Sequence, residues 1–128
     1  MLDAAEPMAF LPSQDLDRSE QFFSGALGLT LESRSPFASV FRCGALALRV
    51  TKVDGLRPQP FTVFGWVVED IHGVLDQLRQ HGVEPVVYDG VEQDAQGVWT
   101  TPNGDRIAWF HDPDGNVLSL TAFAAADD

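Results

Sequence analysis

The feature that most constrains the fold of this 128-residue chain is an internal repeat. Gln14-Asp15-Leu16 matches Glu69-Asp70-Ile71, and Leu27-Gly28-Leu29 matches His81-Gly82-Val83. The two copies are offset by 55 residues at the aspartates and by 54 at the glycines. Aspartate is a favoured helix N-cap and glycine a favoured helix terminator, so each copy predicts one helix of similar length.

Apolar patterns support both helices and predict strands around them. The second helix carries apolar residues at i, i+3, i+4 and i+7, which are Ile71, Val74, Leu75 and Leu78. The first carries Leu16, Phe22, Phe23, Ala26 and Leu27. Short apolar runs bounded by Gly, Pro, Asn or Asp predict strands over 8–11, 30–33, 37–42, 45–50, 61–68, 85–88, 97–101, 106–111 and 117–123.

The order of these elements predicts an α+β fold made of two tandem βαβββ modules. Module one covers residues 7–51 and module two covers 61–123, both within a single domain, 1–128. Residues 52–60, with one glycine and two prolines, form the linker. We expect residues 124–128 to be a frayed tail.

A turn before the last strand sets the register of that strand. Asp112-Pro113-Asp114-Gly115-Asn116 lies between two apolar runs. Proline presets φ for a turn, aspartate accepts hydrogen bonds from nearby backbone amides, and Gly-Asn tolerates positive φ. The pattern predicts strand, tight turn and strand.

Charge and cysteine content exclude several classes of function. The net charge is −11, and the eight basic residues are scattered. This argues against a nucleic-acid partner and against an anionic membrane surface, since both require clustered cations. The one cysteine, Cys43, forms no intramolecular disulfide and has no catalytic partner near it in sequence. With no signal peptide or long apolar run, we expect a cytoplasmic protein.

The doubled βαβββ pattern, the segment from Asp15 to Phe23 with the following Leu27-Gly28-Leu29, and the Asp112–Asn116 turn resemble the vicinal oxygen chelate superfamily. That family includes glyoxalase I, bleomycin-resistance proteins and extradiol dioxygenases. The resemblance implies a curved, cup-shaped sheet with helices on its convex side. It also implies a homodimer in which the cup forms a cavity for a small organic molecule.

The enzymes of that family bind a divalent metal through His, Gln or Glu on the first and last strand of each module. The resemblance places these four positions at Met8, Ala47, Phe64 and Ser119, and none of these side chains suits such an ion. Shifting the register by one residue brings no better ligand. His72, His81 and His111 are expected to be solvated or capping residues. We therefore expect no metal and no other cofactor.

Side chains alternate across a strand, so each strand offers two faces. The aliphatic sets of residues are expected to pack under the helices. The opposite sets coincide with the positions at which the family places its ligands, and they predict a cup lined by Met8, Phe10, Ala47, Arg49, Phe64, Trp66 and Ser119. An inward Arg49 would be a forked donor for a carboxylate or phosphate. Trp99 and Trp109 flank a hairpin, and one of them, taken as Trp109, is expected at the cavity.

These observations favour a metal-free binding protein that sequesters an aromatic or amphipathic ligand at a dimer interface. Two alternatives remain open. One is a lyase, isomerase or dioxygenase of the same fold, with or without a metal, whose catalytic group is not recognisable in the sequence. The other is a regulatory or interaction module whose aromatic residues are simply core. Nothing in the sequence names the ligand.

Overall fold

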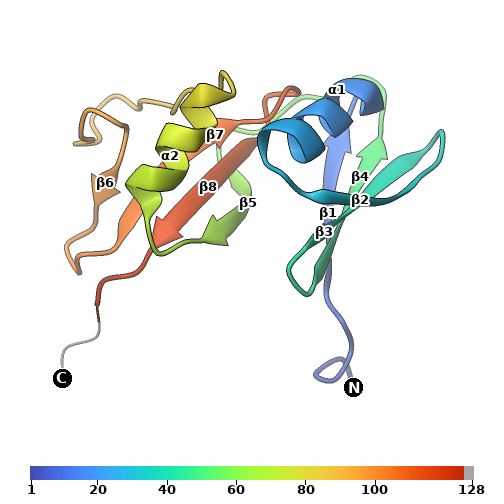
Figure 1. The fold of residues 1–128 in the computed structure, drawn as a ribbon, viewed down its shortest axis with the longest axis horizontal. Helices are drawn as coiled ribbons and strands as arrows, with labels where there is room; N and C mark the ends of the chain where they lie inside the picture. The colour runs from blue at the N-terminus through green and yellow to red at the C-terminus, as the bar shows by residue number, and fades with distance from the viewer. Residues whose placement is uncertain (126–128) are drawn as a thin grey trace. The chain divides into compact units, whose positions relative to one another are not determined.

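The computed structural model describes residues 1–125 and divides the chain into two compact units, Met1–Pro58 and a second that begins at Gln59 (Figure 1). Residues 126–128, part of the predicted tail, lie outside the described residues. Each unit contains one helical segment and one four-stranded sheet. None of the helices in the part described is both long and apolar enough to cross a membrane.

The two units repeat the same topology. Unit 1 has the sheet order β1-β4-β3-β2, and unit 2 has the order β5-β8-β7-β6. In each, the first strand pairs in parallel with the last, and the remaining pairs are antiparallel. The predicted α+β fold of tandem βαβββ modules is therefore confirmed, with two mixed sheets and no closed barrel.

The elements of unit 1 are β1 (Met8–Ser13), α1 (Leu16–Glu20), η1 (Gln21–Ala26), β2 (Thr30–Arg34), β3 (Ala38–Cys43) and β4 (Leu46–Lys52). Those of unit 2 are β5 (Thr62–Val67), α2 (Ile71–Gln80), β6 (Trp99–Thr100), β7 (Arg106–His111) and β8 (Val117–Ala122).

The helical segment of unit 1 begins at the predicted cap. The Asp15 carboxylate accepts hydrogen bonds from the backbone amides of Asp17 and Arg18, at 3.1 and 3.2 Å. The helix does not stay α-helical to Gly28 as expected, because residues 21–26 form a π-helical turn in which Leu27 N donates to Phe22 O. Gly25 lies in that turn, and glycine has little intrinsic preference for the α-helix.

The core of unit 1 lies between α1, η1 and the sheet. Helix α1 packs on β3 and β4. Phe23, fully buried in η1, contacts Phe41 of β3 with 5.5 Å between ring centroids. Two fully buried hydroxyls, Ser13 on β1 and Ser19 on α1, hydrogen-bond to each other. Burying these groups costs little because each hydroxyl satisfies the other.

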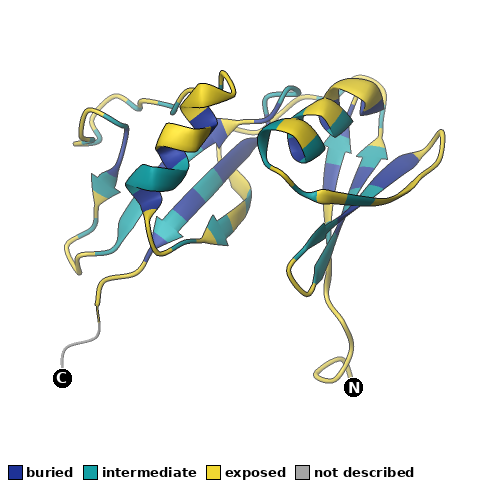
Figure 2. Cartoon of the chain, viewed as in Figure 1, coloured by how far each residue is buried: buried dark blue, intermediate teal, exposed yellow. Residues whose placement is uncertain are grey.

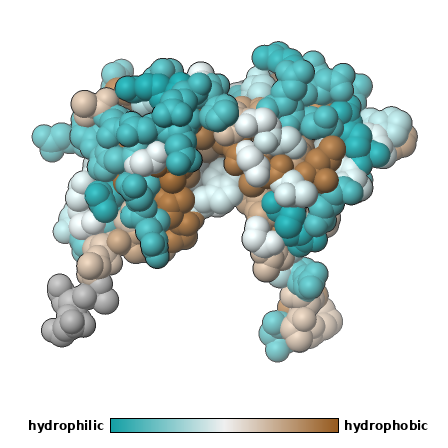
Figure 3. All heavy atoms as spheres, viewed as in Figure 1, coloured by the Kyte–Doolittle hydropathy of each residue, from teal (hydrophilic) through white to brown (hydrophobic). Residues whose placement is uncertain are grey.

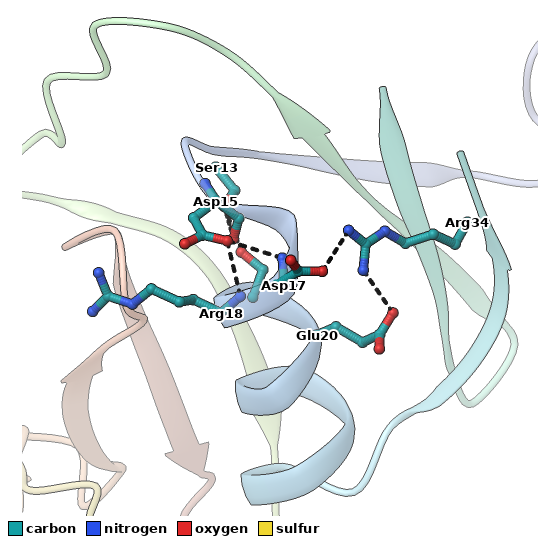
Figure 4. A network of polar contacts seen from close by, with 7 residues as sticks. Ser13, Asp15, Asp17, Arg18, Glu20 and Arg34 are labelled. Atoms are coloured by element: carbon teal, nitrogen blue, oxygen red, sulfur yellow. Dashed lines mark hydrogen bonds and ion pairs between the residues drawn. The ribbon is translucent and has the colours of Figure 1, made fainter. Parts of the chain in front are cut away.

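A charged network on the surface also joins α1 to the sheet (Figure 4). Arg34 of β2 donates to Asp17 at 2.9 Å and to Glu20 at 3.1 Å, both on α1. All three side chains are at least one-third exposed, so solvent screens the interaction and its contribution to stability is small. The network orients the helix more than it stabilises it.

Helix α2 covers one face of the second sheet, packing on β7 and β8. Asp70 caps it by accepting from Gly73 N at 3.0 Å, as predicted. Ile71, Leu75 and Leu78 are buried against the sheet, and Figure 2 shows the exposed residues on its outer side. Gly82 then adopts φ +79° and ends the helix.

Two predicted strands of unit 2 are reduced. Residues 85–88 form no strand, because only Pro85 makes a bridge, to Phe110. Proline has no N–H to extend a ladder, and Val86 adds a single hydrogen bond to Trp109 O at 2.8 Å. The strand predicted over 97–101 shortens to β6, of two residues. The module keeps three strands after the helix.

The Asp112–Asn116 turn is formed as predicted and is a polar site within the core. Asp112, 5% exposed, accepts from Asn116 N and Asp114 N through Oδ1, and from Asn116 Nδ2 through Oδ2, at 2.8–3.0 Å. Gly115 takes φ +86°. Burial raises the pKa of Asp112, although the hydrogen bonds from Asn116 act in the opposite direction.

The first prediction concerns this turn. Asp112→Ala removes three hydrogen bonds and leaves their buried N–H donors without an acceptor. We therefore expect the free energy of unfolding to fall by about 2–4 kcal/mol. Asp89→Ala, in an exposed turn of the same unit, is the matched control and should change it by less than about 0.5 kcal/mol. Urea unfolding monitored by circular dichroism measures both. Equal effects of the two substitutions would contradict the role given to Asp112.

Candidate functional site

Each sheet has one face covered by the helix of its own unit and one face without a helix. We call the second the helix-free face. In unit 1 the covered face carries Leu11, Phe41 and Leu48, all buried. Strand alternation places the intervening residues on the helix-free face. Figure 3 shows hydrophilic residues over the outer sides of the helices and hydrophobic residues over the strands beneath them.

Four of the predicted site residues share the helix-free face of unit 1. Met8 pairs with Ala47 and Phe10 pairs with Arg49 across the parallel β1–β4 ladder. Residues opposite each other in a ladder point to the same side of the sheet, so the predicted common face is confirmed. Met8 is 44% and Phe10 62% exposed. Their role in binding a ligand stays a prediction.

The two arginines on this face differ in their partners. Arg42 of β3 donates to both carboxylate oxygens of Glu32, at 2.8 and 3.0 Å. Arg49, on the central strand β4, lies between Phe10 and Val40 in the register and forms no ion pair or hydrogen bond from its side chain within residues 1–125. It is therefore an available cation on this face.

In unit 2 the predicted face of β5 is wrong. Phe64 and Trp66 are in register with Leu118 and Leu120, which are buried on the helix-covered side. Trp66 stacks on buried Phe110, with centroids 6.2 Å apart. A bulge between Thr62 and Phe64 is the reason, because one extra residue turns every following side chain to the opposite face.

Gly65 consequently replaces Phe64 as the neighbour of Ser119. The two are paired in the β5–β8 register, and a Cβ on Gly65 would lie 2.3 Å from Ser119 Oγ and 2.8 Å from Ser119 O. The strand thus needs a glycine at this position. Ser119 keeps a half-buried hydroxyl on the helix-free face, opposite Trp109.

Both tryptophans of the β6–β7 hairpin lie on the helix-free face of unit 2. Trp99 pairs with Ile107 and Trp109 with Ser119, and the two indoles stack with centroids 6.2 Å apart and planes 20° apart. Tyr88 from the preceding loop meets Trp109 edge-on at 5.3 Å. We call Tyr88, Trp99 and Trp109 the aromatic platform. The sequence identified only Trp109 as a site residue and did not indicate Tyr88.

A glutamine holds the loop that supplies Tyr88. Gln93 accepts from Tyr88 N at 2.8 Å and donates to Val86 O and Gly97 O, at 2.9 and 2.8 Å. Its amide therefore satisfies three backbone groups of a segment that has almost no strand pairing. No sequence motif marks this residue. The only feature of Gln93 that the sequence shows is its position in the polar segment between the strands predicted over 85–88 and 97–101.

The same loop is attached to α2 through charged groups. His72 Nε2 lies 2.8 Å from Asp94 Oδ2, and the backbone amides of Gln96 and Val98 donate to Asp94 Oδ1. Burial acts to raise the pKa of Asp94, but the hydrogen bonds from His72, Val98 and Gln96 leave it below its usual value. Residues 88–95, a segment with three acidic side chains, are therefore fixed by hydrogen bonds to α2 and to the following backbone.

The acidic excess belongs almost entirely to the second half of the chain. Residues 1–58 contain six basic and seven acidic residues, whereas residues 59–128 contain two basic and twelve acidic residues. Unit 1 is close to neutral, and unit 2 carries nearly all of the net charge.

The residues at the positions implied for a metal do not fit one. The implied positions are Met8, Ala47, Phe64 and Ser119; Met8 lies beside Ala47 in the register, and Ser119 lies beside Gly65 and not beside Phe64. They offer a thioether and a hydroxyl but no carboxylate or imidazole, a poor donor set for Zn, Fe, Mn or Ni. No group of three or more His, Cys, Asp or Glu elsewhere in residues 1–125 is arranged to hold an ion.

A shallow surface hollow beside the start of α1 is a weaker candidate for a ligand site. Polar residues form most of its lining, which comprises Gln14, Asp15, Leu16, Asp17, Arg34, Pro36 and Lys52. Its arginine already pairs with Asp17 and Glu20, and Asp15 is engaged as a helix cap. It offers little apolar surface, so the helix-free faces are the better candidates.

Comparison with known proteins agrees with the fold. The model of the Glyoxalase/Bleomycin resistance protein/Dioxygenase superfamily matches residues 7–120. No curated protein matches the sequence. Among solved structures, TnmS3, an antibiotic binding protein from Streptomyces sp. CB03234, is 21% identical with a TM-score of 0.73, covering 97% of this chain and 99% of that one.

Two further structures share the fold at low identity. A lactoylglutathione lyase from Agrobacterium tumefaciens is 17% identical with a TM-score of 0.68, covering 93% of each chain. A glyoxalase/bleomycin resistance protein/dioxygenase from Alicyclobacillus acidocaldarius is 18% identical with a TM-score of 0.73, covering 95% of this chain and 93% of that one. At these identities the likeness establishes the fold only.

The second prediction concerns Gly65. Gly65→Ala forces its methyl group against the backbone of Ser119, and we expect a loss of about 1–3 kcal/mol in unfolding free energy. Gly25→Ala, in η1 with no atom within 4 Å of the new Cβ, is the matched control and should be neutral or stabilising by up to about 1 kcal/mol. Thermal unfolding of both variants measures the difference, and an unaffected Gly65→Ala would refute the close approach.

The third prediction concerns metals. Because the donor set is poor, purified protein equilibrated with Zn²⁺, Ni²⁺ or Mn²⁺ and then dialysed should retain well below one equivalent per chain by elemental analysis. Its melting temperature should not rise with any of the three ions. One retained equivalent, removable by a chelator, would overturn this assessment of Met8, Ala47, Phe64 and Ser119.

Proposed function

The chain belongs to the Glyoxalase/Bleomycin resistance protein/Dioxygenase superfamily, and from that membership we propose that it binds a small aromatic or amphipathic organic molecule without a metal ion. The observation that carries the proposal is the stacked Trp99–Trp109 pair on the helix-free face of unit 2. Aromatic rings bury large apolar areas, and indoles standing on a sheet offer planar surface to a planar ligand.

The surroundings of the platform suit such a ligand. Tyr88 closes one side of Trp109, and the half-buried Ser119 hydroxyl lies on the neighbouring strand as a donor or acceptor. Apolar surface with a few placed polar groups is typical of small-molecule sites. Gln93 keeps Tyr88 in place through the backbone, so the platform is held before any ligand arrives.

The comparisons favour binding over catalysis as the first hypothesis to test. A structural neighbour of this fold is described as an antibiotic binding protein. Another is a lactoylglutathione lyase, but residues 1–125 contain no group of three or more His, Cys, Asp or Glu side chains that could hold a metal ion. We therefore propose no reaction for this chain. The homodimer and the cytoplasmic location remain predictions.

The fourth prediction tests the platform with a neutral probe, 2-naphthamide, in isothermal titration calorimetry. Trp99→Ala and Trp109→Ala should each weaken its binding about 3- to 10-fold, because each removes one aromatic contact surface. Trp109→Phe should lose less. Phe37→Ala, an exposed aromatic in a loop of unit 1, should bind like the unaltered protein. Circular dichroism checks that each variant is folded.

Binding of 2-naphthamide that is unaffected by both tryptophan substitutions would place its site elsewhere. Absence of binding by 2-naphthamide and by a panel of larger planar compounds would overturn the proposed function.

A further inference from the structure

We propose that the helix-free face of unit 1 contains a carboxylate-binding site built around Arg49, so that the protein selects organic ligands bearing a single anionic group next to an apolar body. This goes beyond the function proposed above, because it is a second site, on unit 1 and independent of the aromatic platform of unit 2. The sequence alone suggested that Arg49 is a forked donor but did not show whether another residue of the chain already uses it.

The first step is the position of Arg49. It lies on β4, a central strand, so paired strands flank it on both sides. Its in-register neighbours are Phe10 on β1 and Val40 on β3, neither of which carries a charge. A guanidinium held between apolar side chains and partly removed from water, as its intermediate burial indicates, gains from an incoming anion.

The second step is the contrast with Arg42 on the same face. Arg42 donates two hydrogen bonds to Glu32 on the adjacent strand and a third to Ala45 O, as expected for a purely structural arginine. Within residues 1–125, no carboxylate forms an ion pair or hydrogen bond with the Arg49 side chain, and its in-register neighbours are Phe10 and Val40. Its fork of donors therefore remains available to a planar carboxylate, which a guanidinium binds through two parallel hydrogen bonds.

The third step concerns Thr51, which lies two residues along β4 on the same face. Its Oγ1 is buried without a hydrogen-bond partner among the described residues, but the chain itself covers this atom, so it is no contact for a ligand. Ser39 Oγ, on the helix-covered side, is buried and unpartnered in the same way. The donors of this site are therefore those of the Arg49 guanidinium alone.

The fourth step limits the ligand to a monoanion with an apolar body. One unpaired arginine balances one negative charge, and the chain's overall charge of −11 repels polyanions such as nucleotides. The exposed side chains of Met8 and Phe10, on the same face, offer contact to hydrocarbon or aromatic groups. Unit 1, with nearly balanced charge, does not itself oppose a single anion.

The test compares two probes of the same shape, 2-naphthoate and 2-naphthamide, by isothermal titration calorimetry at low and moderate salt. 2-Naphthoate should bind at the Arg49 site of unit 1 at least about tenfold more tightly than 2-naphthamide binds on the platform of unit 2, because charge-assisted hydrogen bonds are stronger than neutral ones. Trp109→Ala, which weakens 2-naphthamide binding, should leave this binding of 2-naphthoate unchanged. Arg49→Gln should remove this preference and leave the affinity for 2-naphthamide unchanged. Arg49→Lys should retain part of it.

The matched control is Arg18→Gln, which removes the same charge from an exposed position on α1 of the same unit. It should keep the full preference for 2-naphthoate. In ¹⁵N spectra of the arginine Nε–H groups, the signal lost in Arg49→Gln should be the one that shifts most when 2-naphthoate is added to the unaltered protein.

The outcomes separate this proposal from the proposed function. Equal affinity for the two probes, or a preference that survives Arg49→Gln, overturns the carboxylate site while aromatic binding stands. Equal loss of preference in Arg18→Gln shows a general charge effect and also overturns it. Failure of both probes to bind removes this proposal directly, and the planar-compound panel then decides the fate of the broader function.

Discussion

Parallel pairing between the first and last strands of each module determines which side chains can act together. The hydrogen bonds of the β1–β4 and β5–β8 ladders place residues far apart in sequence side by side, such as Phe10 with Arg49 and Gly65 with Ser119. Because alternate residues face opposite sides, each ladder separates a buried, helix-covered set from a helix-free set. The candidate sites in both units follow from that separation.

Much of the architecture follows from local patterns in the sequence, and the failures have specific causes. Caps at Asp15 and Asp70 and the Asp112–Asn116 turn are local features, so sequence reasoning located them correctly. The face of β5 depends on a bulge that no residue type announces. The face on which Trp99 lies depends on which residue of β7 it pairs with, and therefore on whether the number of loop residues is odd or even. Here an odd number separates the paired Thr100 and Arg106, so Trp99 pairs with Ile107 and lies on the same face as Trp109.

The two helix-free faces have different chemistry, although they come from a repeated module. The face of unit 2 gathers planar aromatic surface in an acidic half of the chain. The face of unit 1 has an unpaired guanidinium beside exposed apolar side chains in a nearly neutral half. The repeated module thus supplies the same frame twice, with different side chains on the helix-free side of each copy. On neither face do residues 1–125 bring three or more carboxylate, imidazole or thiol groups together as a divalent ion requires.

The close approach of Gly65 and Ser119 has an evolutionary consequence. A new acidic side chain at position 119 alone would lack a partner across the ladder. A side chain at position 65 would collide with the backbone of β8 and not only with a movable hydroxyl. A larger residue at position 65 would therefore require β5 and β8 to move apart. New side-chain chemistry at this point of the ladder is expected to arise on β8, at position 119, and not on β5.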